Sequence, residues 1–182
     1  MIDLRNKELP SHIEWEGGSC AIETDFRVWI EFGEYLKKKQ LYLGVFPGSK
    51  PPKGEGWETA LYEFYSCRNV VPRAYGTSNV RALDLVIDGE FIVASFQQAY
   101  GIDLTSCEYM HWHRFKALLS GLPDDTKMSK IIGYRTWTKH DSNRKHDDLM
   151  QEQRAVWTLP LDEATEDEYG GFGALLGALG EI

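Results

Sequence analysis

The stretch from Asp84 to Arg135 constrains the fold more than any other part of this sequence. Its large apolar residues recur three or four positions apart, as on one face of a helix, and glycine or proline interrupts the pattern sharply. The longest such stripe comprises Trp112, Phe115, Leu118, Leu119 and Leu122. Because an apolar helix face has to be buried against another element, we expect a mainly α chain of packed helices.

The same reasoning predicts about five to six helices and a small N-terminal β-hairpin. The hairpin is expected over residues 11–23, where Ile13 and Trp15 alternate with polar residues before a glycine-containing turn. It should pack on helices, because a lone hairpin is marginally stable. Helices are expected from the N-cap Thr24 to Lys37-Lys38-Lys39, from about Trp57 to Cys67, from Asp84 to Tyr100, from Thr105 or Ser106 through Leu122, and from Asp124, Asp125 or Thr126 through Ile132. The charged residues 139–154 form a further solvated helix or a partly ordered arm, which Pro160 ends.

Length and composition indicate one folded domain with short extensions. The 182 residues are 42% hydrophobic and 13% aromatic, which is enough to bury a core. We expect an N-terminal arm over residues 1–10, a single helical domain with its hairpin over 11–160, and a C-terminal tail over 161–182. The tail begins acidic and ends in a glycine-rich apolar run. That run either docks on a neighbouring copy or a partner, or frays, and fraying is favoured because glycine is a poor helix former.

Charge and cysteine content exclude several classes of function. The formal net charge of −8 argues against a general nucleic-acid role, which needs a positive field. The three cysteines are widely spaced and form no C-x-x-C pair, which fits a reducing compartment. The first residues lack the apolar core of a signal peptide, and no apolar run approaches the roughly 20 residues that span a bilayer. We therefore expect a soluble intracellular protein that binds neither nucleic acid nor membrane.

Two histidine-containing clusters raise the question of a metal. His111 and His113 would point about 200° apart on a helix, which disfavours a shared metal and predicts one packed and one exposed histidine. The second cluster has metal-ligand residue types without a known ligand spacing, so a solvated charged face explains it better. Its members are His140, Asp141, His146, Asp147 and Asp148. A small metal-dependent hydrolase using His111, His140 and the nearby aspartates is therefore the weakest hypothesis.

Acidic residues near predicted helix ends have more than one interpretation. Asp84 and Asp88 lie one helical turn apart near a helix start, where they could act as an acid–base pair. Stabilising the positive end of the helix dipole is the favoured explanation. Asp103 either caps the next helix or pairs with a cation such as Arg135, and the sequence leaves this choice open.

The aromatic residues suggest a core and a binding surface. Trp112 and Phe115 are expected to fill the core. Tyr100 and Tyr134 carry hydroxyl groups near helix ends, and tyrosine is common at protein interfaces, so these two residues and Arg135 are the candidate partner-binding residues. We recognise no catalytic triad, phosphate loop or closed metal site, which favours binding over catalysis.

Several motifs of the central block together carry a family resemblance. They are Ala94-Ser95-Phe96, the Y-G-I-D-L of residues 100–104, His111-Trp112, Gly121-Leu122-Pro123 and Gly133-Tyr134-Arg135. With these motifs the chain resembles the bacteriophage gene-product-fifteen family of siphophages and prophages of Gram-positive bacteria. The D-F-R-V-W of residues 25–29 resembles the family's N-terminal signature, and the similarity extends over about residues 12–160.

The resemblance implies a non-enzymatic protein of tail morphogenesis, similar to tail assembly chaperones. Such proteins coat the tape-measure protein, a long amphipathic helical chain prone to aggregation, and recruit tail-tube subunits before they leave. It thus implies the tape-measure and tail-tube proteins as partners and the host cytoplasm as location, with no cofactor, and it leaves homo-oligomerisation open. The alternative is a structural minor tail protein that is retained in the virion.

Overall fold

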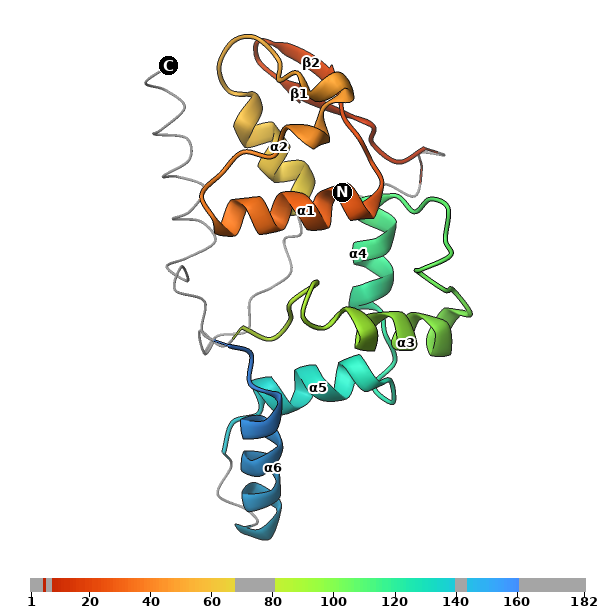
Figure 1. Ribbon diagram of the computed structural model, residues 1–182, viewed down its shortest axis with the longest axis vertical. Helices are drawn as coiled ribbons and strands as arrows, with labels where there is room; N and C mark the ends of the chain where they lie inside the picture. Colours follow the sequence, from red (N-terminus) through yellow and green to blue (C-terminus); the bar gives the residue numbers. More distant parts are fainter. Residues whose placement is uncertain (1–4, 6–7, 68–80, 140–143, 161–182) are drawn as a thin grey trace. The chain divides into compact units, whose positions relative to one another are not determined.

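The computed structural model describes residues 5, 8–67, 81–139 and 144–160, and the predictions for the tail 161–182, His140 and Asp141 lie outside these residues. Within the described residues the chain is mainly α with a two-stranded antiparallel hairpin, which confirms the expected fold class (Figure 1). The strands are β1 (His12–Trp15) and β2 (Gly18–Ala21). The α-helices are α1 (Phe26–Lys37), α2 (Trp57–Tyr65), α3 (Gly89–Tyr100), α4 (Trp112–Ser120), α5 (Lys127–Thr136) and α6 (Arg144–Trp157). Two short 3-10 turns, η1 (Leu43–Val45) and η2 (Pro47–Ser49), lie in the segment between α1 and α2.

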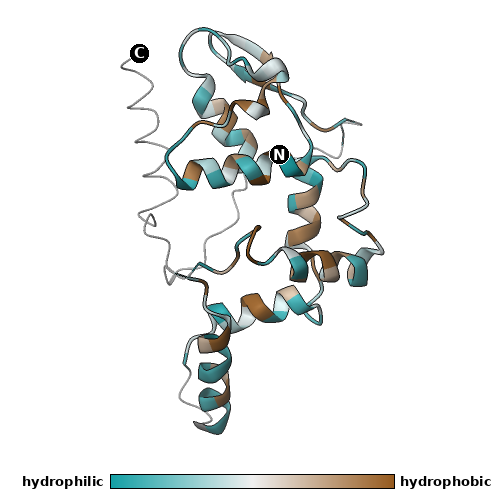
Figure 2. Ribbon diagram, viewed as in Figure 1, coloured by the Kyte–Doolittle hydropathy of each residue, from teal (hydrophilic) through white to brown (hydrophobic). Residues whose placement is uncertain are grey.

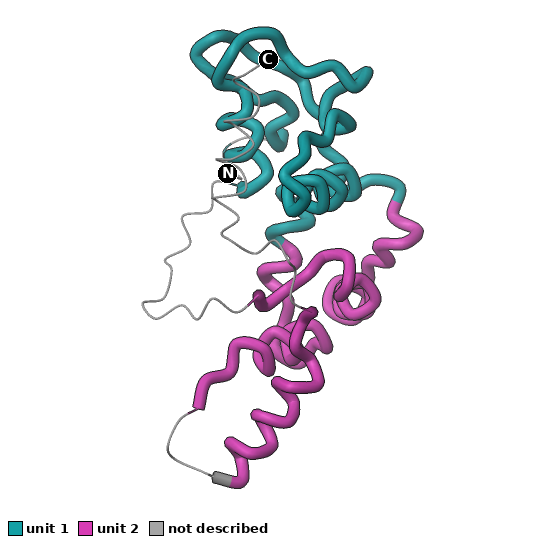
Figure 3. The backbone as a smooth tube through the Cα atoms, turned by 60° about the vertical axis from the view of Figure 1, so that its left-hand side comes forward, with its two compact units in different colours: residues 1–70, 108–117, 162–182 teal, residues 71–107, 118–161 magenta. Residues whose placement is uncertain are grey.

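The described residues fall into two compact units (Figure 3). Unit 1 takes its described residues from Met1–Val70 and Glu108–Ala117, and unit 2 takes them from Val71–Cys107 and Leu118–Leu161. Each unit has its own set of buried apolar side chains. The domain boundaries expected from the sequence stay a prediction.

The N-terminal hairpin forms as expected and belongs to unit 1. It turns at Glu16-Gly17, so that Trp15 pairs with Gly18 and Ile13 with Cys20. In this register Ile13 is buried, and β1 packs against α2. The contact supplies the helical support that a two-stranded hairpin needs.

Aromatic rings build the core of unit 1. Trp29 of α1 packs on Phe64 of α2 with their ring centroids 4.6 Å apart, and Phe32 meets Tyr65 edge-on at 5.2 Å. The ring of Tyr65 stacks nearly parallel on Trp112 of α4 at 5.6 Å. Offset and edge-to-face arrangements at these distances stabilise aromatic cores beyond the effect of burial alone.

The start of α1 differs by one residue from the sequence expectation. Asp25, and not Thr24, is the N-cap, and its carboxylate accepts the backbone N–H of Arg27 at 3.0 Å. The hydroxyl of Thr24 instead lies 2.7 Å from the hydroxyl of Tyr109. Thr24, which the local sequence pattern predicted as the N-cap, therefore makes a tertiary contact with its side chain instead.

The predicted helix that was to begin at Thr105 or Ser106 starts only at Trp112. The backbone before it pairs with the start of α1: the N–H of Trp112 donates to the carbonyl of Thr24 at 2.8 Å. The N–H of Phe26 likewise donates to the carbonyl of Met110 at 2.9 Å. Backbone groups committed to a distant segment cannot also form the first helical turn, so α4 is shorter than predicted. Phe115 then stacks on Phe26 at 4.8 Å, and both Trp112 and Phe115 are buried as expected.

In unit 2, α3 packs against α5 and α5 against α6. The hydroxyl of Ser95 on α3, which is fully buried, accepts the backbone N–H of Met128 at the start of α5 at 3.0 Å. Thr126 is the N-cap of α5, which selects one of the three caps expected there. Gly101 ends α3 in the left-handed region, at φ 65°, as its sequence position predicts.

The charged segment after α5 forms a helix from Arg144 on, whereas Lys139 is not helical. Of the two alternatives for residues 139–154, the solvated helix is confirmed over α6, which is mainly hydrophilic in Figure 2. Helix α6 packs against α5, and its Met150 and Trp157 are half-buried. The predicted helix from Asp84 is shorter than expected, because α3 begins at Gly89. The residues before it form the turn described next.

Candidate functional site

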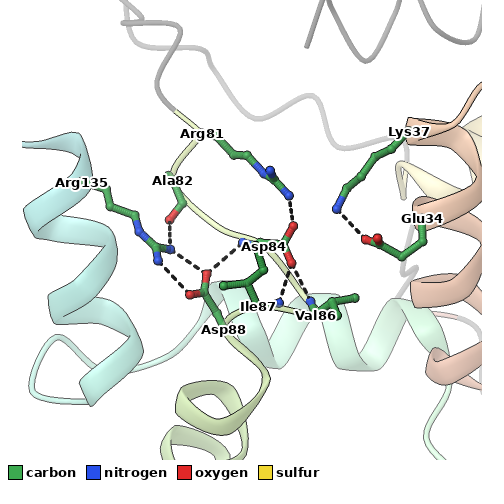
Figure 4. A network of polar contacts seen from close by, with 9 residues as sticks. All are labelled: Glu34, Lys37, Arg81, Ala82, Asp84, Val86, Ile87, Asp88 and Arg135. Atoms are coloured by element: carbon green, nitrogen blue, oxygen red, sulfur yellow. Dashed lines mark hydrogen bonds and ion pairs between the residues drawn. The ribbon is translucent and has the colours of Figure 1, made fainter. Parts of the chain in front are cut away.

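A buried ion pair lies at the centre of unit 2. The guanidinium of Arg135 on α5 donates from Nη1 to Oδ2 of Asp88 at 2.6 Å and from Nη2 to Oδ1 at 2.8 Å (Figure 4). It also donates from Nη1 to the carbonyl of Ala82 at 3.1 Å and from Nε to the carbonyl of Trp157 at 2.6 Å. Asp88 is 0% and Arg135 4% exposed. Bidentate pairing with additional hydrogen bonds offsets the free-energy cost of removing two opposite charges from water.

The second carboxylate of this region builds a tight turn ahead of α3. Oδ1 of Asp84 accepts the backbone N–H groups of Val86 at 2.8 Å and Ile87 at 2.7 Å, and Asp84 pairs through Oδ2 with Arg81 (Figure 4). Asp88 in turn accepts the backbone N–H of Asp84 at 2.9 Å. Both carboxylates thus bond to the backbone of this turn, and Asp88, the N-cap residue of α3, also pairs with Arg135.

The turn formed by residues 84–88, here called the braced turn, presents two aliphatic side chains to solvent. Val86 is 55% and Ile87 51% exposed, although both lie between the buried Asp84 and Asp88. Their backbone is held by the Asp84 carboxylate, and the turn is tied to α5 and the end of α6 through Arg135. An exposed apolar pair on a rigid support has the character of an interaction site, since little order is lost when a partner covers it.

The three residues predicted to bind a partner have different environments. Arg135 occupies the interior of unit 2 and serves its ion pair. Tyr100 is half-buried and its hydroxyl donates to the carbonyl of Leu118 at 2.8 Å. Tyr134 on α5 is half-buried. The predicted partner contacts stay a prediction, and the geometry favours Tyr134 over the other two.

Asp103 takes neither of the two roles that the sequence left open. Its carboxylate accepts the backbone N–H of Thr105 at 2.8 Å and the hydroxyls of Thr105 and Ser106 at 2.6 and 2.9 Å. These bonds, those to Thr105 first, lower the pKa of the Asp103 carboxyl. Asp103 is thus a local turn former, while Arg135 pairs with Asp88.

In unit 1 both His111 and His113 are buried, which corrects the expectation of one exposed histidine. The backbone N–H of His113 donates to Nδ1 of His111 at 3.0 Å, so the His111 proton resides on Nε2, which donates to the carbonyl of Pro10 at 2.9 Å. Nε2 of His113 bonds the carbonyl of Phe64 at 2.9 Å. Burial lowers the pKa of both imidazoles, that of His113 to about 4. Both rings are therefore neutral packing groups near pH 7.

The metal hypothesis finds no geometric support in the residues that are described. Among them, no group of three or more histidine, cysteine, aspartate or glutamate side chains is placed to hold an ion. His111 belongs to the buried pair in unit 1, and Asp147 is buried on α6 in unit 2. His140 and Asp141 lie outside the described residues.

Sequence reasoning missed the Val86–Ile87 pair because it assigned these residues to a helix. The available signal was the D-x-x-x-D spacing around them, in which the first aspartate can cap a turn as well as a helix. The partner of the second aspartate could not be read locally, since Arg135 is 47 residues away.

Comparison with known proteins identifies the family. The family model described as "Bacteriophage Gp15 protein" matches residues 62–159, more than half of the chain. No curated protein matches. No solved structure matches either. No helix in the described residues has the length and apolar character to cross a membrane. The matched range includes the braced turn, its ion pair and helices α3 to α6, and on this match the chain belongs to the bacteriophage Gp15 family.

Proposed function

We propose that this phage protein is a tail assembly chaperone, which binds the tape-measure protein in the host cytoplasm and helps the tail tube to polymerise. It acts by binding and performs no catalysis. Family membership supports a phage role, and the observation that carries the binding role is the exposed Val86–Ile87 pair on its braced turn.

The chemistry of the turn suits an amphipathic helical partner. Covering apolar surface contributes about 25 cal/mol per Å², so Val86 and Ile87 add a modest but useful increment when a helix lays its apolar stripe on them. The preformed turn keeps the entropic cost of ordering low. Modest affinity at each contact suits a chaperone, because its client has to be released when the tube closes around it.

Of the two predicted tyrosines, Tyr134 is the better candidate for this contact. It lies on α5, one residue before Arg135, and its side chain is half-buried. Tyrosine adds a large apolar ring with a hydrogen-bonding tip at small entropic cost. Tyr100, whose hydroxyl is bonded inside unit 2, is the weaker candidate.

Co-purification with the tape-measure protein of the same phage tests the proposal. We expect Val86→Ser with Ile87→Ser, and separately Tyr134→Ala, to reduce the recovered tape-measure protein at least about fivefold, which corresponds to about 1 kcal/mol. Leu43→Ser is the matched control, because Leu43 is an exposed aliphatic residue of unit 1 and its loss should leave recovery unchanged. Equal recovery with all variants would contradict the proposed surface.

Mass spectrometry of purified virions separates the chaperone from a structural minor tail protein. A chaperone leaves before the particle matures, so we expect the protein to be absent or present only in traces. A fixed number of copies in every particle would contradict the chaperone role and support a structural minor tail protein.

A further inference from the structure

Helix α6 has one face that is hydrogen-bonded to other described parts of unit 2 and another that is exposed to solvent. On the hydrogen-bonded face, Nη1 of Arg154 donates to the carbonyl of Trp137 at 3.5 Å, and the carbonyl of Trp157 accepts from Arg135. On the opposite face a single ridge consists of four residues spaced four, three and four positions apart: Lys145, Leu149, Glu152 and Val156. Residues with this spacing lie above one another along a helix.

The ridge is exposed along its length. Leu149 is 53% and Val156 72% exposed, and both charged members are exposed as well. Within the described part of the chain, neither Lys145 nor Glu152 forms an ion pair. The two charges are seven residues apart, about 10 Å along the axis, which is too far for them to pair with each other in one helix.

We propose that this ridge is the interface with a second copy of the chain, formed by two α6 helices packed antiparallel. Along the ridge a cation, Lys145, is followed by Leu149 and then by an anion, Glu152. When the second helix runs in the opposite direction, this order places opposite charges face to face. Leu149 then meets Leu149 of the second copy at the two-fold axis. On each side of it, Lys145 of one copy faces Glu152 of the other, so one patch supplies both halves of a symmetric interface.

The charges select this arrangement over the parallel one. In a parallel pair the two Lys145 ammonium groups would face each other, as would the two Glu152 carboxylates, and like charges across a helix pair are destabilising. A single helix pair is smaller than a standard protein interface, so we expect a weak dimer.

Sedimentation velocity of the full chain over a range of concentrations tests the proposal. The wild type should show a concentration-dependent monomer–dimer equilibrium. Lys145→Glu alone and Glu152→Lys alone each create two like-charge contacts and should weaken the dimer at least about tenfold. The doubly reversed variant, K145E with E152K, restores both attractions and should dimerise like the wild type. Lys53→Glu, the same charge change on an exposed loop of unit 1, should have no effect.

Mixing the two single variants gives the sharpest result. Each is impaired alone, but a pair of one K145E chain and one E152K chain contains two Lys–Glu contacts, so an equimolar mixture should regain dimer. Leu149→Ser should abolish the dimer, because it removes the apolar side chain at the two-fold axis. Circular dichroism of each variant verifies that α6 is intact. A wild type that is monomeric at all concentrations, or a mixture that fails to associate, overturns the proposal.

Discussion

The Arg135 guanidinium and the Asp88 carboxylate form a two-pronged ion pair across 47 residues of sequence, and both side chains are enclosed by unit 2. Through the same guanidinium, the carbonyls of Ala82 and Trp157 are joined to α5. One side chain therefore ties the turn before α3 to the end of α6. The exposed Val86–Ile87 pair owes its fixed position to this interior arrangement.

Arg135→Met should be among the most destabilising single changes in unit 2. It leaves the Asp88 carboxylate buried without its counter-charge, which costs about 3–5 kcal/mol. Urea unfolding, combined with hydrogen exchange of the α3 and α5 amides, measures the loss. Arg114→Met, at an exposed position of α4, is the control and should change stability by less than about 0.5 kcal/mol. A cost below about 1 kcal/mol for Arg135→Met would show that the ion pair is not needed to hold the turn.

Gly33→Ala should destabilise unit 1 through a steric clash with one hydroxyl group. A Cβ at Gly33 would lie 2.6 Å from Oη of Tyr65, whereas the nearest ring carbon is 3.4 Å away. The ring is held by Phe32 and Trp112 and cannot turn aside easily, so we expect a loss of about 1–3 kcal/mol. In a Tyr65→Phe background the same change should be neutral or stabilising, because alanine favours helices over glycine by about 1 kcal/mol. Thermal unfolding of the four proteins gives the comparison, and equal costs in both backgrounds would refute it.

Ser95→Ala should weaken the contact between α3 and α5. The Ser95 hydroxyl accepts the backbone N–H of Met128. The alanine side chain has no acceptor, so this N–H would lose its hydrogen-bond partner. An unsatisfied buried donor costs about 1–3 kcal/mol. Ser19→Ala, at an exposed position of the hairpin, is the matched control. Faster hydrogen exchange at the Met128 amide in the Ser95 variant alone is the expected signature, and unchanged protection there would contradict it.

Stability should fall as the pH is lowered below about 6.5, through the buried histidines. Burial lowers the pKa of His113 from 6.5 to about 4, so the unfolded chain binds a proton at a higher pH than the folded chain does. Stability is therefore fully present above pH 6.5 and is lost progressively toward pH 4. Between pH 7.5 and pH 5 the loss from this residue is about 2 kcal/mol.

His113→Gln tests the source of that pH dependence. Glutamine retains a donor for the carbonyl of Phe64 but has no proton to gain in this range. We expect the slope of unfolding free energy against pH to flatten in this variant. His12→Gln, which alters an exposed histidine of β1, should leave the slope as in the wild type. A slope that persists in His113→Gln would assign the acid sensitivity to other groups, His111 first.

Local sequence alone determined the hairpin, the helical stripes and the Gly101 termination, and it limited the cap of α5 to three candidates. These features depend on side-chain period and on turn chemistry within a few residues, so they are readable without a fold. Trp112 and Phe115 were assigned to the core for the same reason, and both are buried. The family was also identified from short motifs of the central block, which lie within the matched range, whereas the motif at residues 25–29 lies outside it.

The tertiary structure decided where two helices begin and what the buried charged and polar groups do. Residues before α3 and α4 have sequences compatible with helix, but the bonds of Asp84 and the pairing of Trp112 with Thr24 withdraw their backbone groups from it. The burial of both histidines and the pairing of Asp88 with Arg135 depend on segments far apart in the chain. Such bonds outweigh local propensity because a buried charge or backbone group without a partner costs more free energy than a helical turn contributes.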